Sequence, residues 1–179
     1  MRTVGLPTAL LLAFVASTAA ADDRVLREPD PDESPVRAGV SLGLGYATAD
    51  DGEGGTASLL PAQVGLDLLF LSHWEGLLDL RVDFDPASPD TPVSSYTALV
   101  WFAAHFDLLP LSPLVGLGGG ATFDGSEPGK VTGTVGACFG LALWFEASWR
   151  LTLRGAQRLN FDAEWTMPFD LLLTAEYFF

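Results

Sequence analysis

Charged residues recur at even spacings in two segments of this 179-residue sequence. An even spacing keeps side chains on one face of a β-strand, so each set would point the same way. Opposite charges held together away from water either line a narrow polar conduit or form an ion-pair network that fills space. The two sets are Asp79, Arg81 and Asp83 in the first segment and Arg150, Arg154 and Arg158 in the second.

Other charges extend these sets. If the hairpin before Asp79 turns about His73, Asp67 lies opposite Asp79, and Arg81 is the cation that separates the two carboxylates. Glu176 and Arg37 are expected near the same end of the fold. We predict that one internal charge network comprises Arg37, Asp67, Asp79, Arg81, Asp83, Arg150, Arg154, Arg158 and Glu176.

The sequence offers little support for catalysis or metal binding. Acyl transfer needs a histidine beside a serine and a carboxylate, and the two histidines, His73 and His105, occur in no His-x-Ser motif. Cys138 has no flanking His or Lys that would activate its thiol. The clustered acidic residues do not have the spacing of a calcium-binding loop. We therefore predict no catalytic residues, no metal site and no cofactor.

Composition restricts the classes of protein. The net charge is −14, which makes nucleic acid a poor partner because phosphate binding needs a basic surface. Hydrophobic residues make up 49% of the chain and the mean hydropathy is +0.30. No apolar helix of membrane length follows the first 21 residues, so the chain must bury its apolar surface or expose it to lipid along strands.

The chain divides into three predicted parts. Residues 1–21 have the order of a secretory signal peptide: Arg2, an apolar stretch, and small residues that end in an Ala19-Ala20-Ala21 cleavage site. Residues 22–35 are rich in acidic residues and proline, which predicts a disordered leader. Residues 36–179 form the folded domain.

The folded domain predicts strands almost throughout. Apolar residues alternate with small or polar ones in eight segments. The connections between these segments are alternately short turns and longer acidic loops. This rhythm is typical of an up-and-down barrel in which all neighbours are antiparallel. The predicted strands cover about 36–47, 62–70, 78–85, 96–106, 114–123, 131–145, 149–161 and 169–179.

The two faces of these strands differ in a way that predicts lipid on the outside. The apolar face carries no charged residue, and Gln157 is its main polar exception. A charge facing lipid would cost about 2 to 4 kcal/mol at the membrane midplane. The other face is mostly small, which suits the narrow interior of an eight-stranded barrel; such an interior has hardly any open bore, so the charges are expected to plug it. Aromatic residues near the strand ends predict interfacial girdles.

The last strand carries a family resemblance. It ends with Tyr177 and a terminal Phe179, and it resembles the closing strand of bacterial outer-membrane β-barrels, which their assembly machinery reads as an insertion signal. Together with the eight-strand pattern, the chain resembles small OmpA/OmpX-type barrels without a C-terminal peptidoglycan-binding domain. The resemblance implies the outer membrane of a Gram-negative bacterium, with lipid, lipopolysaccharide and the assembly machinery as partners.

The expected function is therefore that of an integral outer-membrane barrel with a structural or surface-interaction role. Two alternatives remain at this point. The barrel could be a narrow channel for small solutes or ions, or it could be a soluble, exported, lipocalin-like binding barrel.

Overall fold

A computed structural model describes residues 36–50, 56–70, 73–88, 93–106, 111–125, 127, 129–146, 148–161 and 166–179. The predicted signal peptide and leader lie outside the described residues, as do the acidic tips of several loops. No helix among the described residues is long and apolar enough to cross a membrane. The strands are β1 (Val36–Asp50), β2 (Thr56–Phe70), β3 (Trp74–Phe84), β4 (Val93–His105), β5 (Leu111–Asp124), β6 (Val131–Glu146), β7 (Trp149–Phe161) and β8 (Phe169–Phe178).

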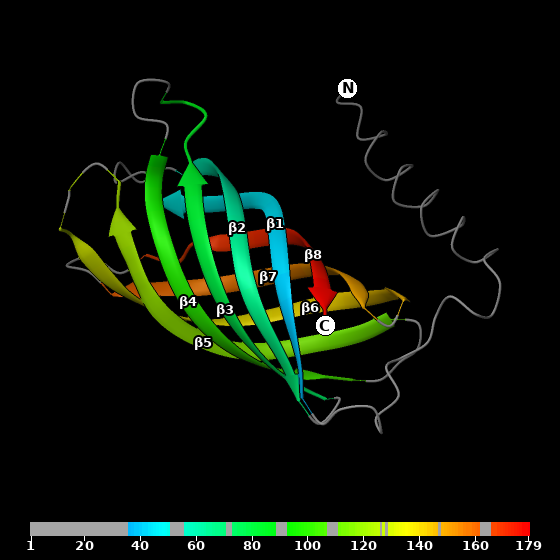
Figure 1. Cartoon of the computed structure of the whole chain (residues 1–179). Coiled ribbons are helices and arrows are strands. Elements are labelled where there is room, and N and C mark those ends of the chain that lie inside the picture. The colour runs from blue at the N-terminus through cyan, green and yellow to red at the C-terminus, as the bar shows by residue number, and fades with distance from the viewer. Residues whose placement is uncertain are drawn as a thin grey trace, which may run out of the picture.

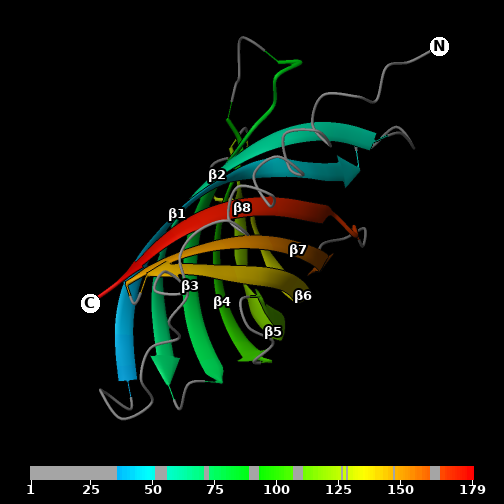
Figure 2. The same ribbon diagram turned by 90° about the vertical axis from the view of Figure 1, so that its right-hand side faces the viewer.

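The eight strands form one closed antiparallel barrel in sequence order, as predicted (Figures 1 and 2). The last strand closes it by pairing with the first, from Gly39 opposite Phe178 to Thr48 opposite Phe169. We call the end with the β2–β3, β4–β5 and β6–β7 connections the short-turn end. Val36 and Phe179 also lie there, and the opposite end is the long-loop end.

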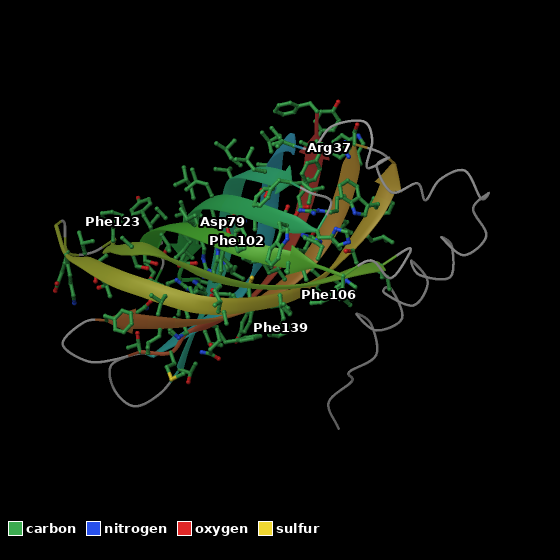
Figure 3. All side chains as sticks on the ribbon, turned by 90° about the horizontal axis from the view of Figure 1, so that it is seen from below. Arg37, Asp79, Phe102, Phe106, Phe123 and Phe139 are labelled. Carbon is green, nitrogen blue, oxygen red and sulfur yellow. The ribbon has the colours of Figure 1, made fainter. Side chains whose placement is uncertain are left out.

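Apolar side chains cover the outside of this barrel. Leu44 and Leu117 expose 69% and 71% of their surface, and bulky residues on all eight strands are similarly open. No outward-facing strand position whose side chain the structure describes carries Asp, Glu, Lys or Arg. Exposed Phe102, Phe123 and Phe139 and buried Asp79 are labelled in Figure 3. The predicted arrangement, with the apolar face outside and the strand charges inside, is therefore confirmed.

Several strands are longer than their patterns predict. We expected the second strand to begin at residue 62, but β2 begins at Thr56 and its ladder with β1 continues beyond Pro61. Pro61 has no N–H to donate, and the β1–β2 pairing skips the positions opposite Leu60 and Pro61 before it resumes. Figure 1 shows β1 and β2 bending toward the long-loop end. The proline therefore interrupts the ladder without ending the strand.

One side of the lumen is filled by apolar side chains. Trp101 and Leu99 of β4 pack with Leu77, Leu114 and neighbours from β5 to β7. The indole ring lies against the backbone at Gly118, where a Cβ would overlap it. The bulky side chain of Trp101 fits because glycines lie against it. The charged residues occupy the remaining side of the lumen.

Candidate functional site

The predicted charge network lies inside the barrel and is organised in three levels along its axis. Strands β3 and β7 run in the same direction on opposite sides of the lumen. Acidic residues of β3 at positions 75, 79 and 83 face arginines of β7 at positions 150, 154 and 158. Each four-residue step corresponds to about 13 Å along the strand, given about 3.3 Å per strand residue. Every one of these six side chains is buried.

The long-loop level contains two arginines and two aspartates. Arg81 donates from Nε to Asp83 at 2.5 Å and its Nη1 lies 2.9 Å from Asp170 Oδ2. Arg158 donates to both oxygens of Asp170, at 2.6 and 3.1 Å. The second oxygen of Asp83 accepts a hydrogen bond from Ser95 at 2.9 Å. The charges of this level therefore balance, two against two.

The middle level is a single ion pair with an amide beside it. Arg154 forms a salt bridge with Asp79 and donates to Gln63 Oε1 at 3.1 Å. The amide nitrogen of Gln63 in turn donates to Asp79 at 2.8 Å. The guanidinium carbon also lies 5.8 Å from the centre of the Trp101 ring, which joins the charged half of the lumen to the apolar half.

The short-turn level is centred on Arg150, which is 1% exposed. It forms salt bridges with Glu75 on one side and Glu176 on the other. Hydrogen bonds from Thr152 at 3.1 Å and Thr174 at 2.8 Å supply further donors to Glu176. Buried charges remain stable only when paired and hydrogen-bonded in this way.

Two aromatic rings close the same level. Phe178 is fully buried, and its ring lies 5.3 Å from that of Trp144. Arg150 lies 4.8 Å from the centre of the Phe178 ring, and Arg37 lies 5.6 Å from it. Arg37 and Glu176 were predicted to lie near one end of the barrel, and both lie here. The aromatic rings between the cations were not predicted.

The register predicted for the second hairpin is wrong. Asp67 lies opposite Leu77, and Asp79 lies opposite Gly65, because the hairpin is centred on residue 72 instead of 73. Arg81 therefore does not separate Asp67 from Asp79; it pairs with Asp83 and Asp170. Asp67 is buried at the short-turn level, and neither of its oxygens has a hydrogen-bond partner among the described residues.

A group of three polar side chains around His105 was not predicted from the sequence. The ring Nε2 lies 2.7 Å from Glu75 Oε2, and Nδ1 lies 3.3 Å from Ser112 Oγ. All three residues are buried. Glu75 could have been found, because it shares the inward register of Asp79 and Asp83. The Ser112 contact depends on the register between β4 and β5, which no local motif specified.

The network leaves little empty space within the lumen. The cavity between the middle and short-turn levels, lined by Ser41, Thr152 and Thr174 among others, has a volume of about 10 Å³, room for one water molecule at most. A polar cavity of about 180 Å³ lies at the long-loop end, beside Asp83, Arg158 and Asn160. Within the described part of the chain, no group of three or more His, Cys, Asp or Glu side chains could hold a metal ion. Cys138 is buried with the apolar side chains.

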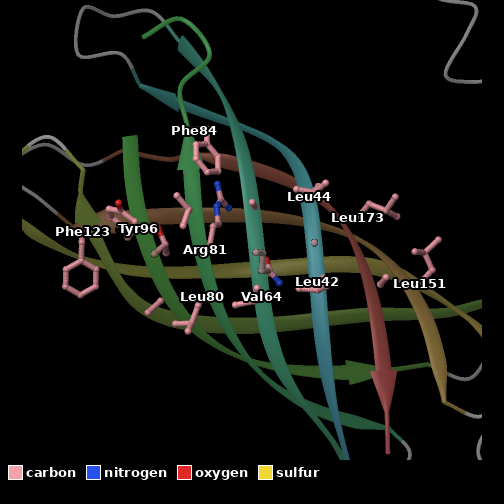
Figure 4. A pocket seen from close by; sticks show the side chains of 17 residues that line it. Leu42, Leu44, Val64, Leu80, Arg81, Phe84, Tyr96, Phe123, Leu151 and Leu173 are labelled. Carbon is pink, nitrogen blue, oxygen red and sulfur yellow. The ribbon is translucent and has the colours of Figure 1, made fainter. Parts of the chain in front are cut away.

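A large hollow lies outside the lumen. It has a volume of about 890 Å³ and runs over the outer face of the barrel, where Figure 4 shows Leu42, Val64 and Leu80 along it. Smaller Ala62 and Ala98 also line it. Its surface is almost wholly apolar, so it belongs to the exposed apolar belt and not to the charge network.

Comparison with known proteins identifies the fold. No protein-family model matches the chain, and no curated protein matches it. The crystal structure of Neisserial surface protein A (NspA) is similar to this chain, with a TM-score of 0.62 at 12% identity. The match covers 80% of this chain and 97% of the NspA chain. A de novo designed transmembrane β-barrel is similar over 82% of this chain and 98% of its own, with a TM-score of 0.51 at 14% identity. At these identities the likeness shows the eight-stranded barrel fold.

Proposed function

We propose that this chain is an integral outer-membrane β-barrel protein with a structural or surface-interaction role and with a lumen closed by its ion-pair network. The observation that carries the proposal is the segregation of charge. All the strand ion pairs described above lie within the lumen, whereas the outward strand face is apolar. A water-soluble barrel would need the opposite arrangement.

The ends of the barrel support its placement in a membrane. Exposed Trp74, Phe106 and Trp149 lie toward the short-turn end, and exposed Tyr46, Phe84, Tyr96 and Phe123 lie toward the long-loop end. Two such rings flanking an apolar band are typical of transmembrane barrels. In the outer membrane the short-turn end would face the periplasm, and lipopolysaccharide would surround the long-loop end. Tyr177 and Phe179, both exposed, would form part of the signal to the assembly machinery.

The packing of the lumen supports a plug over a channel. Each level spans the interior with paired side chains, and the apolar cluster around Trp101 fills the other side. Opening a path would leave buried charges without partners, at a cost of several kcal/mol for each. The acidic loop tips that would present a surface to partners lie largely outside the described residues. The proposal assigns no catalytic activity to the chain.

Two measurements test this proposal. A folded transmembrane barrel migrates differently on a gel before and after boiling and requires detergent for extraction; a chain that leaves with the periplasmic fraction would contradict the membrane placement. In planar bilayers the purified barrel should show no steady conductance. Steady ion-conducting openings in the unmodified chain would favour a channel.

A variant tests the plug more directly. Replacing Arg81 with methionine removes the cation that pairs with Asp83 and leaves Asp170 with Arg158 alone. The change should therefore lower the free energy of unfolding by about 3 to 5 kcal/mol. It should not create conductance, because the middle and short-turn levels remain in place. A variant of undiminished stability that conducts strongly would show that the long-loop level acts as a gate.

A further inference from the structure

The barrel closes where its first and last strands meet, and we call this β1–β8 ladder the seam. It runs from Gly39 opposite Phe178 at the short-turn end to Thr48 opposite Phe169 at the long-loop end (Figure 2). All other neighbouring strands of the barrel are consecutive in the chain, so the chain itself joins them. The two strands of the seam are held together only by the contacts between them.

Strand β1 offers few inward side chains that could hold β8. Its inward positions 39, 43 and 45, all within the seam, are glycines. The inward carboxylates of β8, Asp170 and Glu176, form salt bridges with arginines of β3 and β7. Inside the lumen, these salt bridges attach β8 to β3 and β7 and not to β1.

The side chain of Phe178 differs from these, because its ring crosses the seam. The ring is fully buried and packs on the backbone of β1 at Gly39, where a Cβ would lie 2.9 Å from Cδ1 of the ring. The guanidinium carbon of Arg37, also on β1, lies 5.6 Å from the ring centre. A cation at this distance from the face of an aromatic ring is attracted to it. The ring therefore ties the end of β8 to β1.

The same ring is also held by β6 and β7. The guanidinium carbon of Arg150 on β7 lies 4.8 Å from its centre, and the ring of Trp144 on β6 lies 5.3 Å away. The backbone is bonded in both directions as well. The N–H of Phe178 donates to the carbonyl of Ser148 at 2.8 Å, and the N–H of the next residue donates to the carbonyl of Ala38 on β1 at 2.9 Å. The end of β8 is thus fixed between β7 and β1.

We propose that Phe178 is a latch that holds the seam closed at the short-turn end. This inference goes beyond the proposed function, because it concerns the closure of the barrel wall and holds whether or not the lumen conducts. The last three residues then serve two surfaces: Tyr177 and Phe179 are exposed on the outside, and Phe178 between them is buried inside. Without the latch, β1 and β8 should separate from this end before the rest of the barrel unfolds.

Hydrogen exchange of backbone amides in the full chain, folded in detergent micelles, tests the proposal. Phe178→Leu keeps an apolar side chain and removes the ring. The ring contacts two guanidinium groups and one indole, and each such contact is worth about a two- to tenfold change in an equilibrium constant. Amides of the seam near Gly39 should therefore exchange about tenfold faster or more, whereas amides of the β4–β5 ladder should keep the rates of the parent chain.

Leu99→Ala on β4 is the matched control. It also truncates a buried apolar side chain, but within the cluster around Trp101 and away from the seam. It should accelerate exchange in the β4–β5 ladder and leave the seam near Gly39 protected. If Phe178→Leu accelerated exchange equally in both ladders, Phe178 would be an ordinary core residue and the proposal would be overturned. Unchanged exchange at the seam would overturn it too.

Arg37→Met provides a second variant in case Phe178→Leu does not fold. It leaves the ring in place and removes the cation that lies over it on β1. The same amides of the seam should exchange faster, by a smaller factor than expected for loss of the ring, and the β4–β5 ladder should again keep its rates. If only this variant folds, the absence of any change specific to the seam would refute the latch.

Discussion

Replacing Arg154 with methionine should lower the stability of the barrel by about 3 to 5 kcal/mol, the usual cost of removing one partner of a buried ion pair. Arg154 is the cation of the middle level and contacts both Asp79 and Gln63. Without it, Asp79 keeps the hydrogen bond from Gln63 at 2.8 Å but has no counter-ion among its described contacts. At about 1.4 kcal/mol for each factor of ten, the unfolding constant should rise by a factor of roughly a hundred to several thousand.

The measurement is urea unfolding of the barrel in lipid vesicles, followed by tryptophan fluorescence. A double variant, Asp79→Leu with Arg154→Met, is the matched control because it removes both charges. Apolar Leu77, Leu99 and Trp101 lie nearby, so new apolar side chains should pack there, and most of the lost stability should return. A single variant within 1 kcal/mol of the parent, or a double variant as unstable as the single one, would refute the view that Asp79 depends on this cation.

Two further predictions concern the faces of the barrel wall. Val64→Arg places a charge in the middle of the outward apolar face and should cost about 2 to 4 kcal/mol, whereas Leu111→Arg at the short-turn end should cost at most about 1 kcal/mol; equal costs in vesicle unfolding would contradict the membrane placement. Gly118→Ala introduces a Cβ that overlaps the Trp101 ring and should destabilise the barrel by about 1 to 3 kcal/mol. The same Cβ would also lie 2.7 Å from the backbone carbonyl oxygen of Val100, so Trp101→Leu should relieve the overlap with the ring but only part of the lost stability; a double variant as unstable as the sum of the two single variants would show that the ring is not a source of the strain.

The sequence was sufficient to predict the barrel and the direction in which its side chains point. A side-chain period of two, with charge confined to one register, admits few alternatives, because slipping a strand by one residue would turn charges such as Asp79 and Arg154 toward lipid. The register between strands was less certain. The pattern of side chains is the same whether the hairpin between Asp67 and Asp79 is centred on residue 72 or 73, and the actual register places Asp79 opposite Gly65.

Contacts across the lumen depend on tilt and stagger, which no single strand encodes. His105 and Ser112 meet through the register of the neighbouring strands β4 and β5, and Arg81 reaches Asp170 on a strand far along the sequence. Neither contact has a signal in local spacing. The aromatic pair Trp144 and Phe178, which lies beside Arg37 and Arg150, likewise comes from two strands that are not neighbours in the sheet.

One part of the network nevertheless has a signal in the sequence, a constant separation between paired residues. Strands β3 and β7 run in the same direction, so facing residues on the two strands keep a constant separation in sequence. Glu75 pairs with Arg150, and Asp79 pairs with Arg154, each 75 residues apart. Asp83 and Arg158 have the same separation in sequence, but they do not pair directly. Asp83 pairs with Arg81, Arg158 pairs with Asp170, and Arg81 also pairs with Asp170. A four-residue repeat of acids on one strand and of arginines on a codirectional strand therefore indicates pairing across a narrow lumen. Including Glu75 in that repeat would have indicated the short-turn level, and with it the environment of His105.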